Sequence, residues 1–206
     1  MRRIAESTVR RLSLYLRFLE EFEAQGIETV SSEALAARGQ TTSAQVRKDL
    51  SFFGSFGKRG LGYRVAELAA RLRDILGLER PYRVVVIGAG KIGSALVKYP
   101  GFRERGFNVV SVYDNDESKI GLKWNGLRVR DARRLTDDLV QEPSDIAILV
   151  TPPEVAQEVM DRLVEAGVKA VLNFAPVQLT VPEHVVVKNV NMALELETLS
   201  YALRNS

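Results

Sequence analysis

A glycine-rich turn is the part of this 206-residue chain whose residue types and spacing most clearly suit a ligand. The stretch Gly88-Ala89-Gly90-Lys91-Ile92-Gly93 fits the pattern G-x-G-x-x-G and directly follows the apolar run Val84–Ile87. In such a turn the first glycine allows a tight reversal, the second lets the backbone approach a pyrophosphate, and the third lets a helix pack on a strand. The turn therefore predicts a dinucleotide site, although the pattern alone is weakly specific.

Asp114 supports this prediction because it ends a second expected strand, 21 residues beyond Gly93. An acid at that place accepts hydrogen bonds from the ribose hydroxyls of NAD⁺ or NADH. It also repels a 2′-phosphate, and the next residues, Asn115 and Asp116, supply no arginine to bind one. The residues therefore favour NAD⁺ or NADH over the phosphorylated forms. The alternative is a degenerate nucleotide fold that binds another ligand such as coenzyme A, or nothing.

Side chains that could carry out hydride-transfer chemistry are scarce. Such an enzyme needs a proton donor or acceptor beside the substrate carbon. The only histidine, His184, follows a proline-containing loop, and none of the six tyrosines has a lysine four residues on. The chain has no cysteine, which excludes a thiolate nucleophile and a zinc–cysteine site. We therefore expect no catalytic and no metal-binding residues, with a small NAD-dependent oxidoreductase carrying a helical head as the alternative.

A second candidate functional segment lies before the glycine turn in the chain. Between Thr41 and Arg64 the chain has five basic residues and one acidic residue, a local excess that suits phosphate backbones. Thr42 is followed three residues later by Gln45, the spacing of a capping box that opens a helix. A helix over 10–22, a short helix over 34–38, a glycine and this capped helix follow the order of a helix-turn-helix.

The second helix of a helix-turn-helix enters the major groove with its first residues facing the bases. The candidate DNA-binding residues on that helix are Thr42, Ser43, Gln45, Arg47 and Lys48. Arginine and glutamine suit guanine and adenine edges, and serine and threonine suit phosphates. The glycine-rich stretch 53–63 predicts a small hairpin or wing, with Lys58 and Arg59 at its tip facing the minor groove or the backbone. The alternative is a helical packing or dimerisation domain whose cations are merely solvated.

The candidate DNA-binding residues and the candidate nucleotide-binding residues require two different folds to position them. From Arg83 the pattern alternates strand and helix, which is typical of a parallel sheet. We expect strands at 83–87, 108–113, 145–150, 170–173 and 184–188, and helices at 91–99, 131–140, 153–166 and 191–204. The predicted fold class is α/β: a winged-helix DNA-binding domain at 1–78, a Rossmann-type NAD(H)-binding domain at 79–190 and a C-terminal helix at 191–206. With no apolar run long enough to cross a bilayer and no signal-peptide core, we expect a cytoplasmic protein that avoids membranes.

Along nearly its whole length the chain resembles the Rex family of redox-sensing transcriptional repressors. The stretch Gln45–Gly57 is highly specific for this family, whereas the glycine turn alone is not. The other matching segments are Arg11–Glu21, Gly60–Tyr63, Tyr99–Phe102, Asn173–Pro176 and Leu194–Tyr201.

The resemblance implies a homodimer that binds palindromic double-stranded operator DNA when NADH is scarce and releases it when NADH accumulates. Besides the glycine turn and Asp114, the candidate nucleotide-binding residues are Tyr99, Thr151, Pro152, Asn173, Phe174 and Pro176. Tyr99, Phe174 and Pro176 indicate an apolar pocket. Such a pocket disfavours the oxidised nicotinamide, because desolvating its positive charge costs free energy.

In this family the C-terminal helix crosses to the partner subunit. The spacing of Met192, Leu196, Leu199 and Leu203 by four, three and four residues suits a helix seam of that kind, and the alternative is that they cover their own sheet.

Asn191 is a departure, because family members commonly have an aspartate there. That acid is thought to pair across the dimer with the arginine matched by Arg17 and to bond with the tyrosine matched by Tyr99. A neutral Asn191 therefore predicts a switch that is weaker or differently stabilised. Lys91 also stands where many members have asparagine, and nothing is inferred from it.

Overall fold

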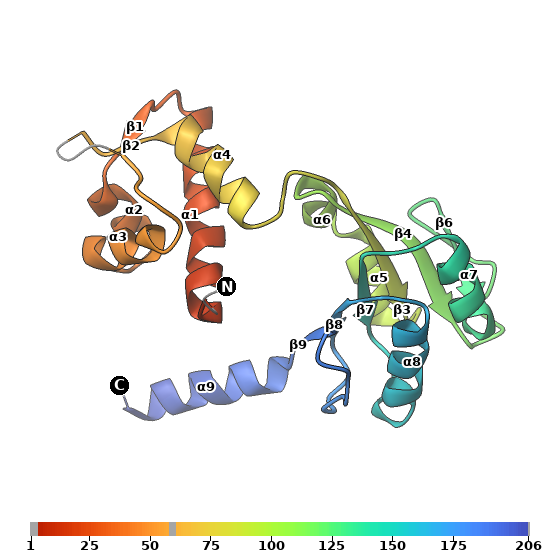
Figure 1. Ribbon diagram of the computed structural model, residues 1–206. Coiled ribbons are helices and arrows are strands. Elements are labelled where there is room, and N and C mark those ends of the chain that lie inside the picture. Colours follow the sequence, from red (N-terminus) through yellow and green to blue (C-terminus); the bar gives the residue numbers. More distant parts are fainter. Residues whose placement is uncertain (1–3, 58–60, 206) are drawn as a thin grey trace. The chain divides into compact units, whose positions relative to one another are not determined.

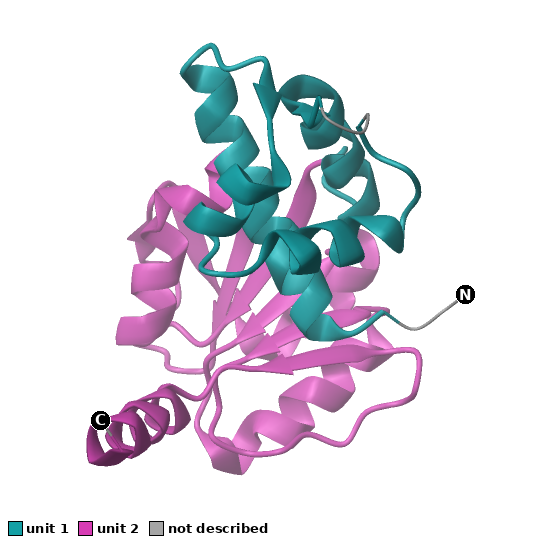
Figure 2. Ribbon diagram, turned by 90° about the vertical axis from the view of Figure 1, so that its left-hand side faces the viewer, with its two compact units in different colours: residues 1–80 teal, residues 81–206 magenta. Residues whose placement is uncertain are grey.

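The computed structural model describes residues 4–57 and 61–205. They form two compact units, Met1–Arg80 and Pro81–Ser206, drawn in two colours in Figure 2. No described helix combines the length and the apolar character needed to span a bilayer.

The first unit is a small helical domain with a two-stranded sheet. Its elements are α1 (Glu6–Ala24), β1 (Thr29–Val30), α2 (Ser32–Arg38), α3 (Ser43–Ser51), β2 (Tyr63–Arg64) and α4 (Val65–Ile75). The helical spacing of Leu12, Leu16 and Leu19 places all three in the core shared with α3 and α4. The Ser31 hydroxyl accepts a hydrogen bond from the Ala34 N–H, and the Thr42 hydroxyl accepts one from the Gln45 N–H, so each hydroxyl caps a helix.

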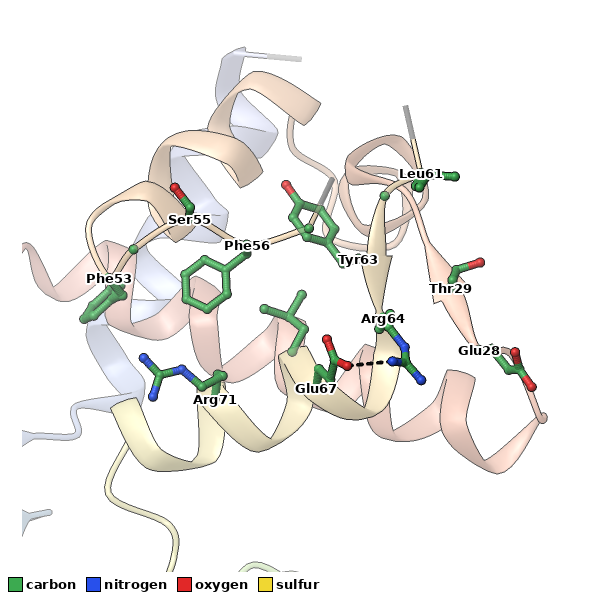
Figure 3. A pocket seen from close by; sticks show the side chains of 14 residues that line it. Glu28, Thr29, Phe53, Ser55, Phe56, Leu61, Tyr63, Arg64, Glu67 and Arg71 are labelled. Atoms are coloured by element: carbon green, nitrogen blue, oxygen red, sulfur yellow. Dashed lines mark hydrogen bonds and ion pairs between the residues drawn. The ribbon is translucent and has the colours of Figure 1, made fainter. Parts of the chain in front are cut away.

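The wing closes on a distant segment. Tyr63–Arg64 pairs antiparallel with Thr29–Val30, so of the hairpin or wing that the sequence predicts at 53–63, the strand at its end pairs outside that stretch. A strand of two residues after Gly26 is too short to show in the sequence pattern. Phe53 and Phe56 pack against the core of the unit. Figure 3 shows them on one side of a cavity of about 650 Å³, with α4 on the other. The expected wing-tip residues Lys58 and Arg59 lie outside the described residues.

The second unit is a doubly wound α/β domain, as predicted (Figure 1). Its strands are β3 (Tyr82–Ile87), β4 (Phe107–Asp114), β5 (Lys123–Trp124), β6 (Leu127–Asp131), β7 (Ile146–Leu149), β8 (Ala170–Asn173) and β9 (Val186–Asn189). Its helices are α5 (Lys91–Lys98), α6 (Pro100–Glu104), the 3₁₀ turn η1 (Ala132–Arg134), α7 (Leu135–Gln141), α8 (Pro153–Glu165) and α9 (Met192–Asn205). The sheet order is β5-β6-β4-β3-β7-β8-β9, and all neighbours are parallel except β5 and β6. The six parallel strands therefore follow the dinucleotide-binding order 3-2-1-4-5-6.

The sequence pattern missed one parallel strand of this sheet. β6 occupies Leu127–Asp131, and a helix had been expected to begin at Asp131. Arg128 and Arg130 interrupt the apolar pattern, as is common near the edge of a sheet. Asp131 then accepts a hydrogen bond from the Arg133 N–H and opens the 3₁₀ turn that precedes α7.

The last helix, α9, has no buried residue. It extends away from the sheet after β9 (Figure 1). Met192, Leu196, Leu199 and Leu203 are all more than half exposed. The alternative that these residues cover their own sheet is therefore wrong.

Candidate nucleotide cleft and nucleic-acid interface

The glycine turn lies where the winding of the parallel sheet reverses, between the adjacent strands β3 and β7. Gly88 has a φ of +110°, and a Cβ there would lie 2.5 Å from the Val150 carbonyl oxygen. A Cβ on Gly93 would lie 2.0 Å from the Gly88 oxygen. Both positions therefore require glycine, because Gly88 packs against Val150, just beyond β7, and Gly93 packs against the backbone of Gly88.

Gly90 is a glycine for a different reason. A Cβ at this residue would meet no atom within 4 Å, so it faces open space rather than protein. Gly90 is also the N-cap of α5, and no side chain caps that helix. The first N–H groups of α5, beginning with those of Lys91 and Ile92, have no partner within the helix, as is usual where a helix N-terminus binds a pyrophosphate. The residues present fit a dinucleotide.

Asp114 lies beside this turn at the end of β4. Its Oδ2 accepts a hydrogen bond of 2.6 Å from the Ala89 N–H, and its Oδ1 accepts one of 2.8 Å from the Asp116 N–H. The side chain is 92% buried and still borders the turn. The structure thus brings together the glycine turn and Asp114, from which the sequence predicted a dinucleotide site with a ribose-binding acid.

Lys119 is a residue of this region that sequence reasoning missed. Its Nζ lies 3.4 Å from Asp114 Oδ2 and 3.1 Å from Asp116 Oδ2. The hydrogen bond with Asp116 raises the pKa of Lys119 above its ordinary value. The absence of an arginine at Asn115 and Asp116 did not reveal this lysine, which the turn after β4 returns to the Asp114 carboxylate. Two carboxylates around one ammonium group leave a net negative charge.

The opposite wall comes from the loops that follow β7 and β8. Thr151 and Pro152 follow β7 after one intervening residue, Val150, and the Thr151 hydroxyl is buried with no hydrogen-bond partner among the described residues. Phe174 and Pro176 follow β8, which pairs with β7. Phe174 packs partly buried in an apolar cluster, and Pro176 is exposed. An orphaned hydroxyl at this edge is a further feature that suits a polar ligand.

Two of the predicted nucleotide-binding residues, Tyr99 and Asn173, contact other protein groups instead of the glycine turn. Tyr99 follows the last residue of α5, about 12 Å of helix away from Gly90, and its ring packs edge-on against Phe102. The structure therefore shows no contact between Tyr99 and the glycine turn. Asn173 is fully buried, and its amide bonds to protein groups on every side. Its contacts are those of a structural residue that shapes the loop.

The candidate nucleic-acid interface is the exposed face of α3. Val46 and Leu50 are buried in the core, which leaves Thr42, Arg47 and Lys48 exposed and Ser43 partly exposed. Arg47 Nη1 donates a hydrogen bond of 2.8 Å to Ser32 Oγ and lies 3.3 Å from Glu33 Oε1. The first turn of α2 therefore holds this guanidinium in the absence of DNA.

Gln45 forms only one of the two hydrogen bonds that a capping box requires. Its backbone N–H binds Thr42, as predicted, but its side chain does not complete the box. Gln45 Nε2 donates to Asp49 Oδ1 at 2.8 Å instead. Asp49 is fully buried and also accepts hydrogen bonds from Arg11 and Tyr15 of α1. Sequence reasoning counted Asp49 only as a charge, because the partners on α1 are more than thirty residues away.

The proposed switch residues lie in separate units. Arg17 is exposed on α1 and forms no ion pair with the residues that the structure describes. Asn191 Oδ1 accepts hydrogen bonds from the Ala193 and Leu194 N–H groups, at 3.0 and 3.4 Å. Asn191 is thus the N-cap of α9, a role that the sequence comparison did not suggest.

A winged helix with a basic recognition helix, joined to a doubly wound dinucleotide cleft, defines a ligand-responsive transcription regulator. Two family models cover most of the chain. One, described as “Putative DNA-binding protein N-terminus”, matches residues 3–51, and one described as “CoA binding domain” matches residues 79–177.

Curated relatives match almost the whole chain. The redox-sensing transcriptional repressor Rex of Carboxydothermus hydrogenoformans is 48% identical over 202 residues, 98% of this chain and 97% of that protein. Rex of Thermus thermophilus is 46% identical over 98% of this chain and 95% of its own. The chain belongs to the Rex family of redox-sensing transcriptional repressors, which confirms the resemblance and sets the oxidoreductase alternative aside.

Solved structures of a Rex-family repressor also match this chain over nearly its whole length. The Rex-family repressor RSP in complex with β-NAD⁺ and operator DNA matches with a TM-score of 0.94 and 38% identity, covering 100% of this chain and 94% of that one. RSP in complex with β-NADH matches with a TM-score of 0.88, covering 98% of this chain and 95% of that one.

Proposed function

We propose that this protein is an NADH-responsive repressor, which binds palindromic operator DNA as a homodimer and releases it when NADH occupies the cleft. One observation carries the proposal: a glycine turn with open space at Gly90 and a buried acid beside it stands in the same chain as a winged helix, and the chain aligns with Rex repressors over 98% of its length. The repressor acts in the cytoplasm, where operator DNA and the NADH pool are found.

The preference for NADH follows from charge. The oxidised nicotinamide is positive and the reduced one is neutral, so an apolar wall penalises the oxidised form by desolvation. The four residues directly after β8 read Phe174-Ala-Pro-Val177 and carry no charged side chain. Only a ligand whose affinity differs between two arrangements of the dimer can shift their populations.

Coenzyme A is the second candidate ligand, because the family model over residues 79–177 is named for it. Both ligands carry a pyrophosphate, which would lie at Gly90 in either case. Asp114 distinguishes them: it suits a free ribose 2′-hydroxyl, and coenzyme A retains such a hydroxyl but adds a 3′-phosphate beside it. The net negative charge around Lys119 therefore favours NADH.

Titration of an operator complex tests the proposal. A duplex selected from a palindromic library is bound by the dimer, and NADH, NAD⁺, NADPH and coenzyme A are added separately while fluorescence anisotropy reports release. We expect release at the lowest concentration with NADH. Equal potency of NADH and NAD⁺ contradicts redox sensing, and release by coenzyme A alone identifies the other ligand.

Gly90 offers a sharp control variant. Because a side chain there meets only open space and the backbone φ is ordinary, Gly90→Asp keeps the fold while an acid enters the space for the pyrophosphate. This variant should bind operator and ignore NADH. Val140→Asp places the same charge on an exposed position of α7 and should respond as the parent does.

A further inference from the structure

Asn173 is the most completely bonded polar side chain beside the cleft. Its Nδ2 donates to the carbonyl oxygens of Ala175 and Val177, at 3.1 and 3.0 Å, and to Asn189 Oδ1 at 2.9 Å. Its Oδ1 accepts a hydrogen bond of 2.9 Å from the Ala175 N–H. Its two N–H groups already serve three acceptors, so the amide cannot donate to a ligand unless one of these bonds breaks.

These bonds join the loop after β8 to the end of β9. Ala175 and Val177 belong to the loop that walls the cleft. Asn189 is the last residue of β9, which pairs with β8 alone, and the next N–H, that of Val190, donates to the Asn173 carbonyl oxygen at 2.7 Å. Asn191 then caps α9, which starts at Met192. Only two residues separate the Asn189 side chain from the first turn of the exposed helix.

We propose that the hydrogen bond between Asn173 and Asn189 couples the occupancy of the cleft to the position of α9, with Asn173 as the positioning residue. A ligand that moves the loop after β8 changes which carbonyl oxygens Asn173 can reach. The same Nδ2 group holds Asn189, so the end of β9 and the start of α9 shift with the loop. The inference rests on the proposed function, because it concerns how the same cleft signals.

The connection between β8 and β9 has a second anchor, which does not lie on this route. Gln157 of α8 donates from Nε2 to the Thr180 carbonyl oxygen at 3.0 Å and accepts from the Thr180 N–H at 2.9 Å. These bonds hold the middle of the connection to α8 and do not reach β9. Gln157 is therefore a matched control: its loss also removes hydrogen bonds from the connection and leaves the pair between Asn173 and Asn189 intact.

The test uses the full-length dimer and three measurements for each variant. These are the NADH dissociation constant from nucleotide fluorescence, the operator dissociation constant without nucleotide, and the ratio of operator dissociation constants with and without saturating NADH. This ratio is the coupling factor. Asn189 is exposed, so Asn189→Leu removes the acceptor with little effect on folding, and Asn189→Asp retains an acceptor oxygen.

We expect Asn189→Leu to lower the coupling factor at least about fivefold, while the two separate dissociation constants stay within about threefold of the parent values. Asn189→Asp should restore most of the coupling, and Gln157→Leu should leave it at the parent value. A purely structural role would change the separate affinities and would not be rescued by aspartate. An unchanged coupling factor in Asn189→Leu overturns the inference alone. A parent protein whose operator affinity ignores NADH overturns the proposed function and this inference together.

Discussion

The guanidinium of Arg11 holds both oxygens of the buried Asp49 carboxylate, with Nε donating to Oδ2 at 2.6 Å and Nη2 donating to Oδ1 at 2.7 Å. Arg11 lies on α1 and Asp49 on α3, so this two-pronged pair fixes the recognition helix to the body of the first unit. Burial would raise the pKa of Asp49, but the hydrogen bonds from Arg11, Gln45 and Tyr15 outweigh burial and hold the pKa below its ordinary value.

Replacing Asp49 with alanine should destabilise the first unit by about 3 kcal/mol, because the partners on α1 and α3 lose their acceptor. Thermal unfolding followed by circular dichroism measures this loss, and operator affinity should fall with it. Arg64→Ala removes an exposed pair with Glu67 and should cost at most about 1 kcal/mol. Equal effects of the two variants would contradict the special role of the buried pair.

Tyr15 gives a prediction at high pH. Burial, together with the charge and the hydrogen bond of Asp49, raises the pKa of Tyr15 to about 12. Because the folded protein holds this proton more tightly than the unfolded chain, the associated stability is complete below about pH 10 and is lost as the pH rises through about 12. The parent should therefore lose more free energy of unfolding than Tyr15→Phe between pH 10 and 12. Denaturant midpoints across that range measure the difference, and parallel curves would exclude it.

We predict that Glu33 competes with DNA for the guanidinium of Arg47. Its carboxylate lies 3.3 Å from the guanidinium, at the start of a helix that crosses the phosphate backbone in a helix-turn-helix complex. We expect Glu33→Gln to tighten operator binding several-fold and to steepen its salt dependence, since one repelling charge is gone. Anisotropy titrations at several salt concentrations measure both effects. Glu158→Gln removes the same charge from an exposed position on α8 and should change neither.

The charges around Lys119 should set the choice between NADH and NADPH. Asp116→Asn leaves one carboxylate beside the lysine and should raise NADPH affinity relative to NADH by about an order of magnitude. Lys119→Met should shift the ratio the other way. Nucleotide fluorescence gives both dissociation constants, and a ratio indifferent to these substitutions would show that the group lies away from the ribose.

Substitutions at Asn191 can distinguish its role as the N-cap of α9 from the effect of the missing negative charge. Aspartate caps a helix about as well as asparagine, so Asn191→Asp should leave the stability of α9 unchanged, whereas Asn191→Ala should lose about 1 kcal/mol. If the aspartate strengthens the response to NADH, the gain should vanish when Arg17→Ala is added, because the new charge then has no partner. A double-mutant cycle on the coupling factor measures this, and a gain that persists without Arg17 would assign the effect elsewhere.

Much of this architecture could be predicted from local patterns. The buried run at Val84–Ile87, the glycines after it and the acid at Asp114 depend on contacts close in the chain or on the regular alternation of strand and helix. The spacing in α9 also predicted an apolar seam, and the structure then decided between an exposed seam and one that covers its own sheet. These features are encoded by periodicity, and periodicity can be counted without a structure.

The remaining features depend on the surroundings that the fold gives each residue, which the local pattern does not show. Gln45 follows the capping pattern, yet a buried carboxylate one helical turn away attracts its amide more strongly. Asn173 lies in a segment that suggests a ligand contact, and only the pairing of β8 with β9 reveals its partner Asn189. β1, with two residues, is too short for any pattern to mark.

The exposed α9 also makes the function of the protein depend on its concentration. Six large side chains on this helix, from Met192 to Leu203, face water in a single copy, at exposures between 56% and 80%. Such a surface drives association and favours aggregation of a solitary chain. Assembly must therefore come before sensing, and dilution below the association threshold should silence the regulator whatever the redox state of the cell.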